Sequence, residues 1–467
     1  MFFSIQENGL SLEAVSLFAN GTPTVIPTPM PVAYGISTDS RTANKNDVFI
    51  ALKGETFDGH RFLGAAEKAG CAFAVVDHAV AECSLPQIVV DDTTKALGRI
   101  AGAYKKLFRT VALAVTGSVG KTTTKEFIRA VISQKYSTNV TKGNFNNEIG
   151  LPLTLFNLTA DHDALLVEMG MNHKGEISAL SRIAQPDISV ITMIGTSHME
   201  NLGSREGIRD AKAEIVDGMK PGGILILNGD EPLLRDVIAD GICKIYVGIE
   251  AQDCTYRAAN LRFADDHILF DLQMHGCNIM KDLCVNVLGR HNVMNALYAC
   301  VCGILLGISE EKIRKGLLSF APAAMRQDFV KKDGFTVIED CYNACPESMS
   351  AALDVLRHAA DVRGENPVAV LGDMKELGPI ADEAHLAVGE KAAKTNIRRL
   401  ITVGDAARLI AAGARAAGMP ADRITELDAN AATEENAALI RNLLQNGDII
   451  LFKASRAMAL ERIASLL

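Results

Sequence analysis

The sequence lacks several features that would place it in a nucleic-acid-binding or membrane class. It has no excess of basic residues, since 47 lysines and arginines stand against 56 aspartates and glutamates, for a formal net charge of −9. A general nucleic-acid surface is therefore not favoured, although local basic pockets remain compatible with this charge. The longest apolar stretch, Ala296–Ile308, is too short to cross a bilayer, and the first residues form no basic leader with an apolar core. We expect a cytoplasmic protein without membrane insertion.

Cysteine motifs are also missing. The ten cysteines include no C-x-x-C pair and no Cys/His spacing typical of a zinc site, so we expect mostly reduced residues of the core. We find no solenoid-like repeat and no low-complexity tract. The length of 467 residues, 48% of them hydrophobic, is enough for two to four domains with separate cores.

The stretch Val111–Ile132, VALAVTGSVGKTTTKEFIRAVI, predicts a strand, a glycine-rich turn and a helix. Gly117 and Gly120 allow backbone N–H groups to converge on phosphate oxygens at the positive end of the helix. Lys121 adds charge, and Thr122 adds a hydroxyl suited to Mg²⁺. The loop is a shortened variant of the usual pattern, because a valine stands where the first glycine is expected. A glycine turn beside a surface lysine is the alternative, but the context favours a nucleoside triphosphate site.

Apolar runs separated by helical patterns predict an α/β protein with three domains. Residues 1–107 predict a small α/β domain, and residues 108–322 a parallel sheet around the phosphate-binding loop with an antiparallel addition at Tyr256–Val287. Residues 323–467 predict another open α/β sheet. The main predicted strands are Val48–Leu52, Phe73–Asp77, Ile88–Asp91, Val111–Val115, Ala164–Met169, Ile188–Ile194, Gly223–Asn228, Phe335–Glu339, Val368–Leu371, Leu400–Val403 and Ile449–Phe452.

Polar residues follow these strands, where parallel sheets bind their ligands. Glu168 ends one strand and can hold the nucleotide's metal beside Thr122. His198 follows the next strand; a single loop histidine is usually a surface or capping residue, but the shared edge favours a metal role. Lys212 is predicted to open a helix shortly afterwards, a position where a lysine is usually solvated.

Several motifs occur in one order along nearly the whole chain: TGSVGKTTTKE, KGNFNNEIGLPLT, VEMGMNHKGEI, SHMENLGS, RDAKAEI, GRHNVMNALYA, MRQD, EDCYNACPESM, GDMKELG and KASR. Together they resemble the Mur ligases, and within that family the branch that joins D-alanyl-D-alanine to UDP-N-acetylmuramoyl-tripeptide. The resemblance implies a UDP-sugar peptide domain (1–107), a central ATP-binding domain (108–322) and a Rossmann-like ligase domain (323–467).

The resemblance also implies a reaction. ATP would phosphorylate the terminal carboxylate of the tripeptide, and the amine of D-Ala-D-Ala would attack the acyl phosphate, giving ADP, phosphate and UDP-MurNAc-pentapeptide for peptidoglycan synthesis. Lys121 and two Mg²⁺ would neutralise the developing charge. We expect a monomer that binds these substrates and no nucleic acid.

Catalytic and nucleotide-binding residues are implied by matching motifs. Thr122 and Glu168 resemble ligands of a first magnesium, and His198 a ligand of a second. Lys212 matches a lysine that family members carbamylate, which would give an anion able to help hold the second metal. Arg326 is implied on the γ-phosphate and Asp340 near the ribose. The implied ATP-binding set is Thr116, Gly117, Ser118, Val119, Gly120, Lys121, Thr122, Thr123, Asn295, Arg326 and Asp340.

Substrate-binding residues are implied in the same way. The uridine and pyrophosphate would lie near Ser40, Arg41, Asp58 and His60; the peptide near Asn144, Asn146, Asn147 and Glu148; and the closing site near Tyr342, Asn343, Lys453, Ser455 and Arg456. Taken alone, the Ser/Thr-rich turn before Arg41 is more often a helix cap or a loop. The chain departs from the family pattern at Cys341, Cys345 and Ala454, where relatives commonly have Ala, Asn and Gly, and none of these changes removes a catalytic charge.

Three alternatives remain open. A MurE-like ligase would carry an Asp-Asn-Pro-Arg motif, which this sequence lacks, and a folylpolyglutamate synthase-like enzyme would lack the STDSR and FDGH segments. A nucleotide-controlled binding module would hydrolyse ATP or GTP without an amino-acid acceptor. The third residue of the accepted tripeptide, diaminopimelate or lysine, is not determined.

Overall fold

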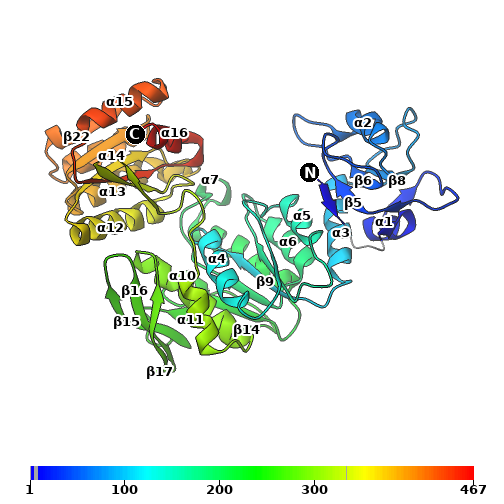
Figure 1. The fold of residues 1–467 in the computed structure, drawn as a ribbon, viewed down its shortest axis with the longest axis horizontal. Helices are drawn as coiled ribbons and strands as arrows, with labels where there is room; N and C mark the ends of the chain where they lie inside the picture. Colours follow the sequence, from blue (N-terminus) through cyan, green and yellow to red (C-terminus); the bar gives the residue numbers. More distant parts are fainter. Residues whose placement is uncertain (1, 5–8, 333) are drawn as a thin grey trace.

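The computed structural model describes residues 2–4, 9–332 and 334–467, and they form three α/β units, each built on its own main sheet. Figure 1 shows the first unit in blue and the last in yellow to red, on opposite sides of a central cyan and green unit. The predicted α/β class with three units is confirmed. The predicted boundaries after residues 107 and 322 fall between α3 (Thr93–Lys105) and β9 (Val111–Thr116), and between α11 (Glu310–Leu318) and β18 (Asp328–Lys332).

The N-terminal unit has a six-stranded sheet in the order β1-β5-β6-β7-β8-β3. Strands β5 to β8 are parallel, and β1 and β3 are antiparallel at the two edges. Its helix α3 packs against α1 and also against α5 and α6 of the central unit, so one apolar cluster runs through both units. The bounds are β1 (Phe2–Ser4), β3 (Thr22–Pro23), β5 (Gly35–Ser37), β6 (Asp47–Ile50), β7 (Phe73–Val76), β8 (Gln87–Val89), α1 (Leu12–Ala19), η1 (Gly59–Phe62) and α2 (Leu63–Lys68).

The central unit has a nine-stranded sheet in the order β10-β11-β9-β12-β13-β14-β15-β16-β17. It is parallel from β10 to β15 and antiparallel from β15 to β17, as the alternation in Tyr256–Val287 predicts. Strand β9, which leads into the phosphate-binding loop, lies between β11 and β12, and α4 packs against α10. The bounds are α4 (Lys121–Ile132), β10 (Thr138–Val140), α5 (Gly150–Leu155), β11 (Ala164–Glu168), α6 (Glu176–Ala184), β12 (Ile188–Ile191), α7 (Met199–Leu202), α8 (Arg205–Ala213), β13 (Ile224–Asn228), β14 (Cys243–Gly248), β15 (Tyr256–Phe263), β16 (Ile268–Met274), β17 (Cys277–Val285) and α10 (Arg290–Leu305).

The C-terminal unit has a six-stranded sheet in the order β18-β19-β23-β20-β21-β22, parallel except for the edge pair β18 and β19. Neighbouring residues of its strands pack on opposite faces, because side chains alternate along a strand. Val368 and Val370 belong to the cluster with α15 and α16, whereas Ala369 and Leu371 belong to the cluster with α12 to α14. The bounds are β19 (Phe335–Glu339), α12 (Pro346–Arg363), β20 (Asn366–Gly372), η3 (Gly378–Ile380), α13 (Ala381–Lys394), β21 (Arg399–Val403), α14 (Ala407–Ala416), β22 (Ile424–Leu427), α15 (Thr433–Leu443), β23 (Asp448–Lys453) and α16 (Leu460–Ser465).

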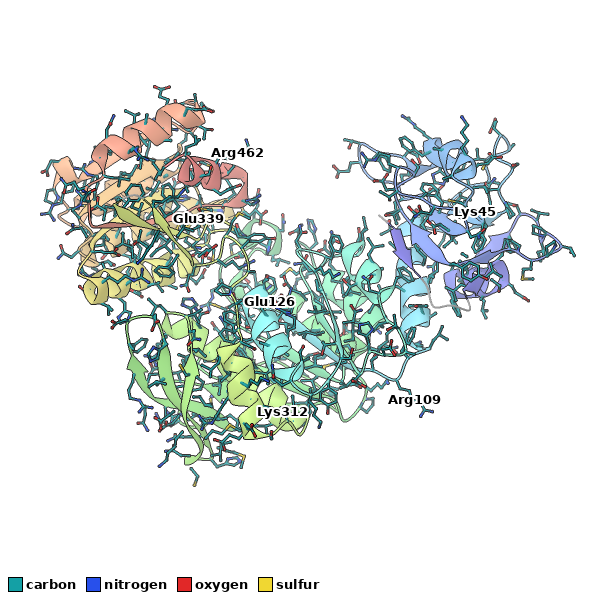
Figure 2. The ribbon with its side chains drawn as sticks, viewed as in Figure 1. Lys45, Arg109, Glu126, Lys312, Glu339 and Arg462 are labelled. Carbon is teal, nitrogen blue, oxygen red and sulfur yellow. The ribbon has the colours of Figure 1, made fainter. Side chains whose placement is uncertain are left out.

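Figure 2 shows how charged side chains are distributed over these units: Lys45 lies on the first, Glu126 and Lys312 on the central one, and Glu339 on the last. Arg109 is exposed on the connection between the first two units. Of the helices in the described ranges, none has both the length and the apolarity needed to cross a membrane.

Candidate active site

The phosphate-binding loop is a tight turn between β9 and α4. Gly117 and Gly120 have φ angles of 147° and 87°, which favour glycine, and a Cβ at Gly117 would lie 1.9 Å from the Oγ1 of Thr192. Thr192 Oγ1 donates to the carbonyl of Val119 at 2.6 Å, and Lys121 Nζ donates to the carbonyl of Gly117 at 2.8 Å. The predicted strand, turn and helix are present, and the loop is held by side chains that contact its own carbonyls.

Glu168 is the last residue of β11 and lies opposite Val115 of the neighbouring strand β9. This pairing places its carboxylate beside the start of α4. Its Oε2 accepts a hydrogen bond from Thr122 Oγ1 at 2.9 Å, and its Oε1 accepts one from Asn146 Nδ2 at 2.8 Å. The structure thus brings together a predicted metal pair and a predicted substrate residue from three segments of the central unit.

Lys125, which sequence reasoning did not single out, is fully buried next to this carboxylate. Its Nζ donates to the carbonyl of Thr141 at 2.8 Å and lies 3.1 Å from Glu126 Oε1 and 4.0 Å from Glu168 Oε2. A buried charge is tolerated when it is paired and hydrogen-bonded. The sequence pattern that could have pointed to Lys125 is its spacing of four residues from Lys121, which places both lysines on the same face of α4.

His198 follows β12 in the left-handed conformation, with φ of 64°. Burial, followed by the positive charges of Lys121 and Lys212, lowers the pKa of its imidazole to about 4. Its Nδ1 is buried and has no hydrogen-bond partner among the described residues. It lies 2.9 Å from the Oε2 of Glu376 in the C-terminal unit, but the geometry is not that of a hydrogen bond. A neutral imidazole with an unpaired nitrogen fits a metal ligand.

Lys212 does not open a helix, which corrects the prediction from sequence. Helix α8 begins at Arg205, because Ser204 caps it by accepting a hydrogen bond from the N–H of Gly207, and Lys212 lies in its last turn. The side chain is buried and not solvated. Burial, followed by the charge of Lys121, lowers the pKa of Lys212 well below its ordinary value. Its amine is therefore biased toward the neutral, nucleophilic form.

A cleft of about 300 Å³ lies between the central and C-terminal units and brings residues of both to the phosphate-binding loop. Arg326 donates from its guanidinium to Thr122 Oγ1 at 3.1 Å and stacks over the ring of Tyr342 at 4.3 Å. Lys453 Nζ pairs with Asp340 Oδ2 at 2.7 Å. The predicted residues that line this cleft are Ser118, Val119, Gly120, Lys121, Thr122, Thr123, Asn146, Glu168, Asn295, Arg326, Asp340, Tyr342, Asn343 and Lys453.

Other predicted residues lie outside this lining. Thr116 Oγ1 donates to the carbonyl of Met169, Ser455 Oγ accepts from the N–H of Lys375, and Arg456 pairs with Glu461. Of the three departures from the family pattern, Cys345 lines the cleft, whereas Cys341 and Ala454 are buried in the C-terminal core.

A second cavity, of about 740 Å³, lies between the N-terminal and central units. Four predicted substrate residues line it, namely Ser40, Arg41, Asn144 and Asn147. Its wall also includes Phe57 and Phe62, whose rings stack with centroids 5.3 Å apart. The Arg41 guanidinium holds the pKa of Asp39 at about 2 through their hydrogen bonds. Sequence reasoning did not single out the aromatic pair, although Phe57 is the first residue of the predicted FDGH segment and Phe62 lies just after it.

Asp58, His60 and Glu148 do not line this second cavity. Asp58 Oδ1 accepts a hydrogen bond from the backbone N–H of His60 and lies 2.7 Å from His60 Nδ1. The other ring nitrogen, His60 Nε2, accepts a hydrogen bond from the backbone N–H of Asp77. These contacts fasten the FDGH segment to the end of β7. Glu148 is exposed at the surface.

Three family models match the chain in order. They are the Mur ligase family, catalytic domain over residues 32–105, the Mur ligase middle domain over residues 115–303, and the Mur ligase, glutamate ligase domain over residues 325–456. The UDP-N-acetylmuramoyl-tripeptide--D-alanyl-D-alanine ligase of Bacillus subtilis is 41% identical over 92% of this chain and 92% of its own. The chain belongs to the Mur ligase family. The resemblance seen in the motifs is thereby confirmed, and with it an ATP-dependent, amide-bond-forming ligase.

Solved structures of Mur ligases show the same architecture. MurF from Acinetobacter baumannii superposes with a TM-score of 0.87 at 31% identity, covering 98% of each chain. MurF from Thermotoga maritima in complex with ADP superposes with a TM-score of 0.81 at 26% identity, covering 92% of this chain and 96% of that one. The three-domain Mur ligase fold of this chain agrees with both structures, and its use of ATP agrees with the ADP complex.

Proposed function

We propose that this Mur ligase joins D-alanyl-D-alanine to UDP-N-acetylmuramoyl-tripeptide with ATP, giving ADP, phosphate and UDP-N-acetylmuramoyl-pentapeptide. One observation carries the proposal beyond the family: Asn146, from the KGNFNNEIG segment, donates to the same carboxylate of Glu168 that accepts from Thr122. The segment that distinguishes this branch by sequence thus touches the centre that binds the nucleotide.

ATP would bind with its phosphates on the loop 117–120 and its charge facing Lys121. The lysine is half-buried, and its desolvation lowers its pKa while the Glu168 carboxylate opposes that shift. The adenine would enter an adjoining cavity of about 510 Å³, which shares Gly120 and Asn295 with the cleft and has apolar walls that include Met294 and Tyr298. Arg326 of the C-terminal unit would reach the γ-phosphate, since it already contacts Thr122.

Two magnesium ions fit the donors present. Thr122 and Glu168 offer a hydroxyl and a carboxylate for the first, and His198 offers a buried, unpaired Nδ1 for the second. Buried Lys212 would react through its neutral amine with CO₂, forming an N–C bond and losing a proton, and the resulting carbamate would add an anionic ligand. When bound, the ions would neutralise charge on the transferred phosphoryl group.

The chemistry then needs two displacements. The peptide carboxylate oxygen attacks the γ-phosphorus and ADP leaves. The neutral amine of D-Ala-D-Ala then attacks the acyl carbon, phosphate leaves, and the nitrogen loses a proton as the amide forms. Lys121 and Arg326 stabilise the charge that develops on the phosphoryl oxygens, because both cationic groups lie at the start of α4. Closure of the C-terminal unit over the cleft would exclude water from the acyl phosphate.

The nucleotide-sugar end of the substrate would bind in the cavity between the first two units. The stacked rings of Phe57 and Phe62 are half exposed and offer a face for the uracil, and Arg41 offers a bidentate donor for the pyrophosphate. Asn144 and Asn147 line this cavity, and Asn146 faces Glu168, so the segment would lead the peptide toward the phosphate-binding loop. Asp58 and His60 would support the aromatic pair by fixing its loop.

The third unit would complete the acceptor site. Tyr342 and Asn343 line the cleft, and Lys453 fastens this segment by donating to the carbonyl of Asn343 at 3.1 Å. Ser455 and Arg456 follow directly in the chain and would meet the dipeptide on closure. Because the substrates are a nucleotide and a nucleotide-linked peptide, we propose a cytoplasmic enzyme, acting as a monomer since residues of one chain supply both ends of the site.

The decisive experiment is phosphate release from ATP with UDP-MurNAc-tripeptide, with and without D-Ala-D-Ala, combined with mass detection of the product. Dipeptide-dependent release and a pentapeptide mass are expected. Phosphate release that does not depend on either substrate would contradict the proposal and favour a nucleotide-controlled module. Parallel assays with tripeptides ending in diaminopimelate and in lysine would identify the accepted third residue. A product formed from a UDP-muramoyl dipeptide and a free amino acid would instead favour a MurE-like ligase.

A further inference from the structure

The GDMKELG motif, residues 372–378, is the one motif that the proposed mechanism leaves without a task. It lies in the C-terminal unit between β20 and η3, and it faces the loop that follows β12 in the central unit. Its Glu376 has a φ angle of 64°, a left-handed conformation that non-glycine residues rarely adopt. Backbone strain of this kind persists where the surrounding structure requires it.

The carboxylate of Glu376 points from the C-terminal unit toward the central unit. Its Oε2 lies 2.9 Å from His198 Nδ1, although Glu376 is 57% exposed and free to turn to solvent. The two atoms lack the geometry of a hydrogen bond. Two ligands at right angles around Mg²⁺, each about 2.1 Å from the ion, are separated by about 3 Å. The separation therefore matches that of two neighbouring ligand atoms on one cation.

The motif is held in this place from both sides. Lys375 donates its N–H to Ser455 Oγ and its Nζ to Asp373 Oδ2, both at 2.8 Å, which fixes the segment within the C-terminal unit. A Cβ at Gly378 would lie 3.0 Å from the Cα of Glu200, so the two backbones approach closely. Ile380 packs against the core clusters of both the central and the C-terminal unit.

A second contact crosses the same boundary a few residues away. Thr196, two residues before His198, donates from Oγ1 to the Oε2 of Glu347 at 3.2 Å. Glu347 lies in the first turn of α12 and lines the nucleotide cleft. The loop that carries His198 therefore meets carboxylates of the C-terminal unit on two sides.

We propose that Glu376 supplies a carboxylate ligand to the cation at His198, so that this cation is held jointly by the central and C-terminal units. The inference rests on the proposed second cation site. It assigns a role to the GDMKELG motif: cation binding and closure of the C-terminal unit stabilise each other, because the full ligand set exists only when the units are in contact. Glu376 is in this role a direct metal ligand and does not contact the peptide.

The test measures Mn²⁺ binding to the full chain in the presence of a non-hydrolysable ATP analogue, by calorimetry and by electron paramagnetic resonance. Variants are Glu376→Gln, His198→Ala and the control Glu200→Gln, which removes an exposed charge on α7 beside the same boundary. We expect Glu376→Gln and His198→Ala each to weaken the second Mn²⁺ at least tenfold, and Glu200→Gln to leave it unchanged. Small-angle scattering should show Mn²⁺-dependent compaction that Glu376→Gln reduces.

The possible failures are distinguishable. If His198→Ala weakens Mn²⁺ binding and Glu376→Gln does not, the role of Glu376 is wrong while the cation site stands. If neither variant changes Mn²⁺ binding, the second cation site itself is misplaced, and the inference falls with it. If Glu200→Gln weakens binding as much as Glu376→Gln, the effect is a general one of charge, which also overturns the inference. Thermal unfolding of each variant verifies that it is folded.

Discussion

Thr122 Oγ1 donates a hydrogen bond to Glu168 Oε2 at 2.9 Å, although 46 residues separate the two in sequence. The contact follows from the parallel pairing of β9 and β11, which brings the end of β11 beside the first turn of α4. Arg326 of the C-terminal unit donates to the same hydroxyl at 3.1 Å. Hydroxyl, carboxylate and guanidinium, drawn from two units, therefore meet at one point beside the phosphate-binding loop.

Replacing Glu168 with Gln should lower kcat by on the order of 10²-fold or more. The amide keeps the shape of the side chain but removes the charge that faces the metal and Thr122. Steady-state phosphate release over a range of Mg²⁺ concentrations checks this, and saturating Mg²⁺ should not restore the rate. A variant with normal turnover would remove Glu168 from the metal site.

The effects of substituting Lys125 and Glu168 on the free energy of unfolding should depend on each other, because the two side chains form a buried pair. Glu168→Gln leaves the Lys125 ammonium with one carboxylate fewer, which we expect to cost on the order of 1–3 kcal/mol. Lys125→Met combined with Glu168→Gln should be less destabilised than the sum of the two single variants. Denaturant unfolding of the four proteins measures this coupling, and strict additivity would show that the two charges do not interact.

Changing Lys121 to Ala should reduce turnover by on the order of 10²- to 10³-fold or more, because the proposed phosphate site then lacks the cation that contacts the loop. The matched control is Lys312→Ala, an exposed lysine on α11 of the same unit (Figure 2), which should retain full activity. Turnover retained in the Lys121 variant would refute the assignment of the loop.

Lys212→Ala should abolish activity, and added bicarbonate should restore little of it, because the carbamate needs the buried amine. Wild-type enzyme incubated with ¹³C-labelled CO₂ should show a carbamate carbon signal that this variant lacks. The exposed Lys220→Ala provides the control. Full activity of Lys212→Ala would exclude the lysine from the mechanism, whereas loss of activity without any carbamate signal in the wild type would exclude only the modification.

The stability of the ligand-free protein should fall between pH 6.5 and pH 4 in part through His198. Its folded-state pKa is lowered to about 4, so unfolded chains bind the proton first as the pH falls below 6.5. The stabilising contribution of the neutral imidazole is complete above pH 6.5 and is lost as the pH approaches 4. His198→Gln should show a smaller decrease in melting temperature across this range; an equal decrease would contradict the shifted pKa.

Most strands and the phosphate-binding loop could be predicted from the sequence alone. The strand Phe335–Glu339 matches the prediction residue for residue, because its mostly apolar run is bounded by Gly334 and Asp340 and is therefore visible locally. The glycine spacing around Lys121 predicted the turn, since only a few backbone conformations allow N–H groups to converge. The order of motifs was enough to identify the Mur ligase family.

Which side chains are buried, and which partners they contact, became visible only in the folded structure. A lysine in a helix is usually solvated, and only the family resemblance pointed to a role for Lys212; packing around α8 buries it and lowers its pKa. The pairing of Lys125 with Glu168 and the approach of Glu376 to His198 join residues from distant segments. Helical and strand periodicity arise from neighbouring residues, whereas burial and partner choice arise from the way whole sheets and units pack, which no local pattern encodes.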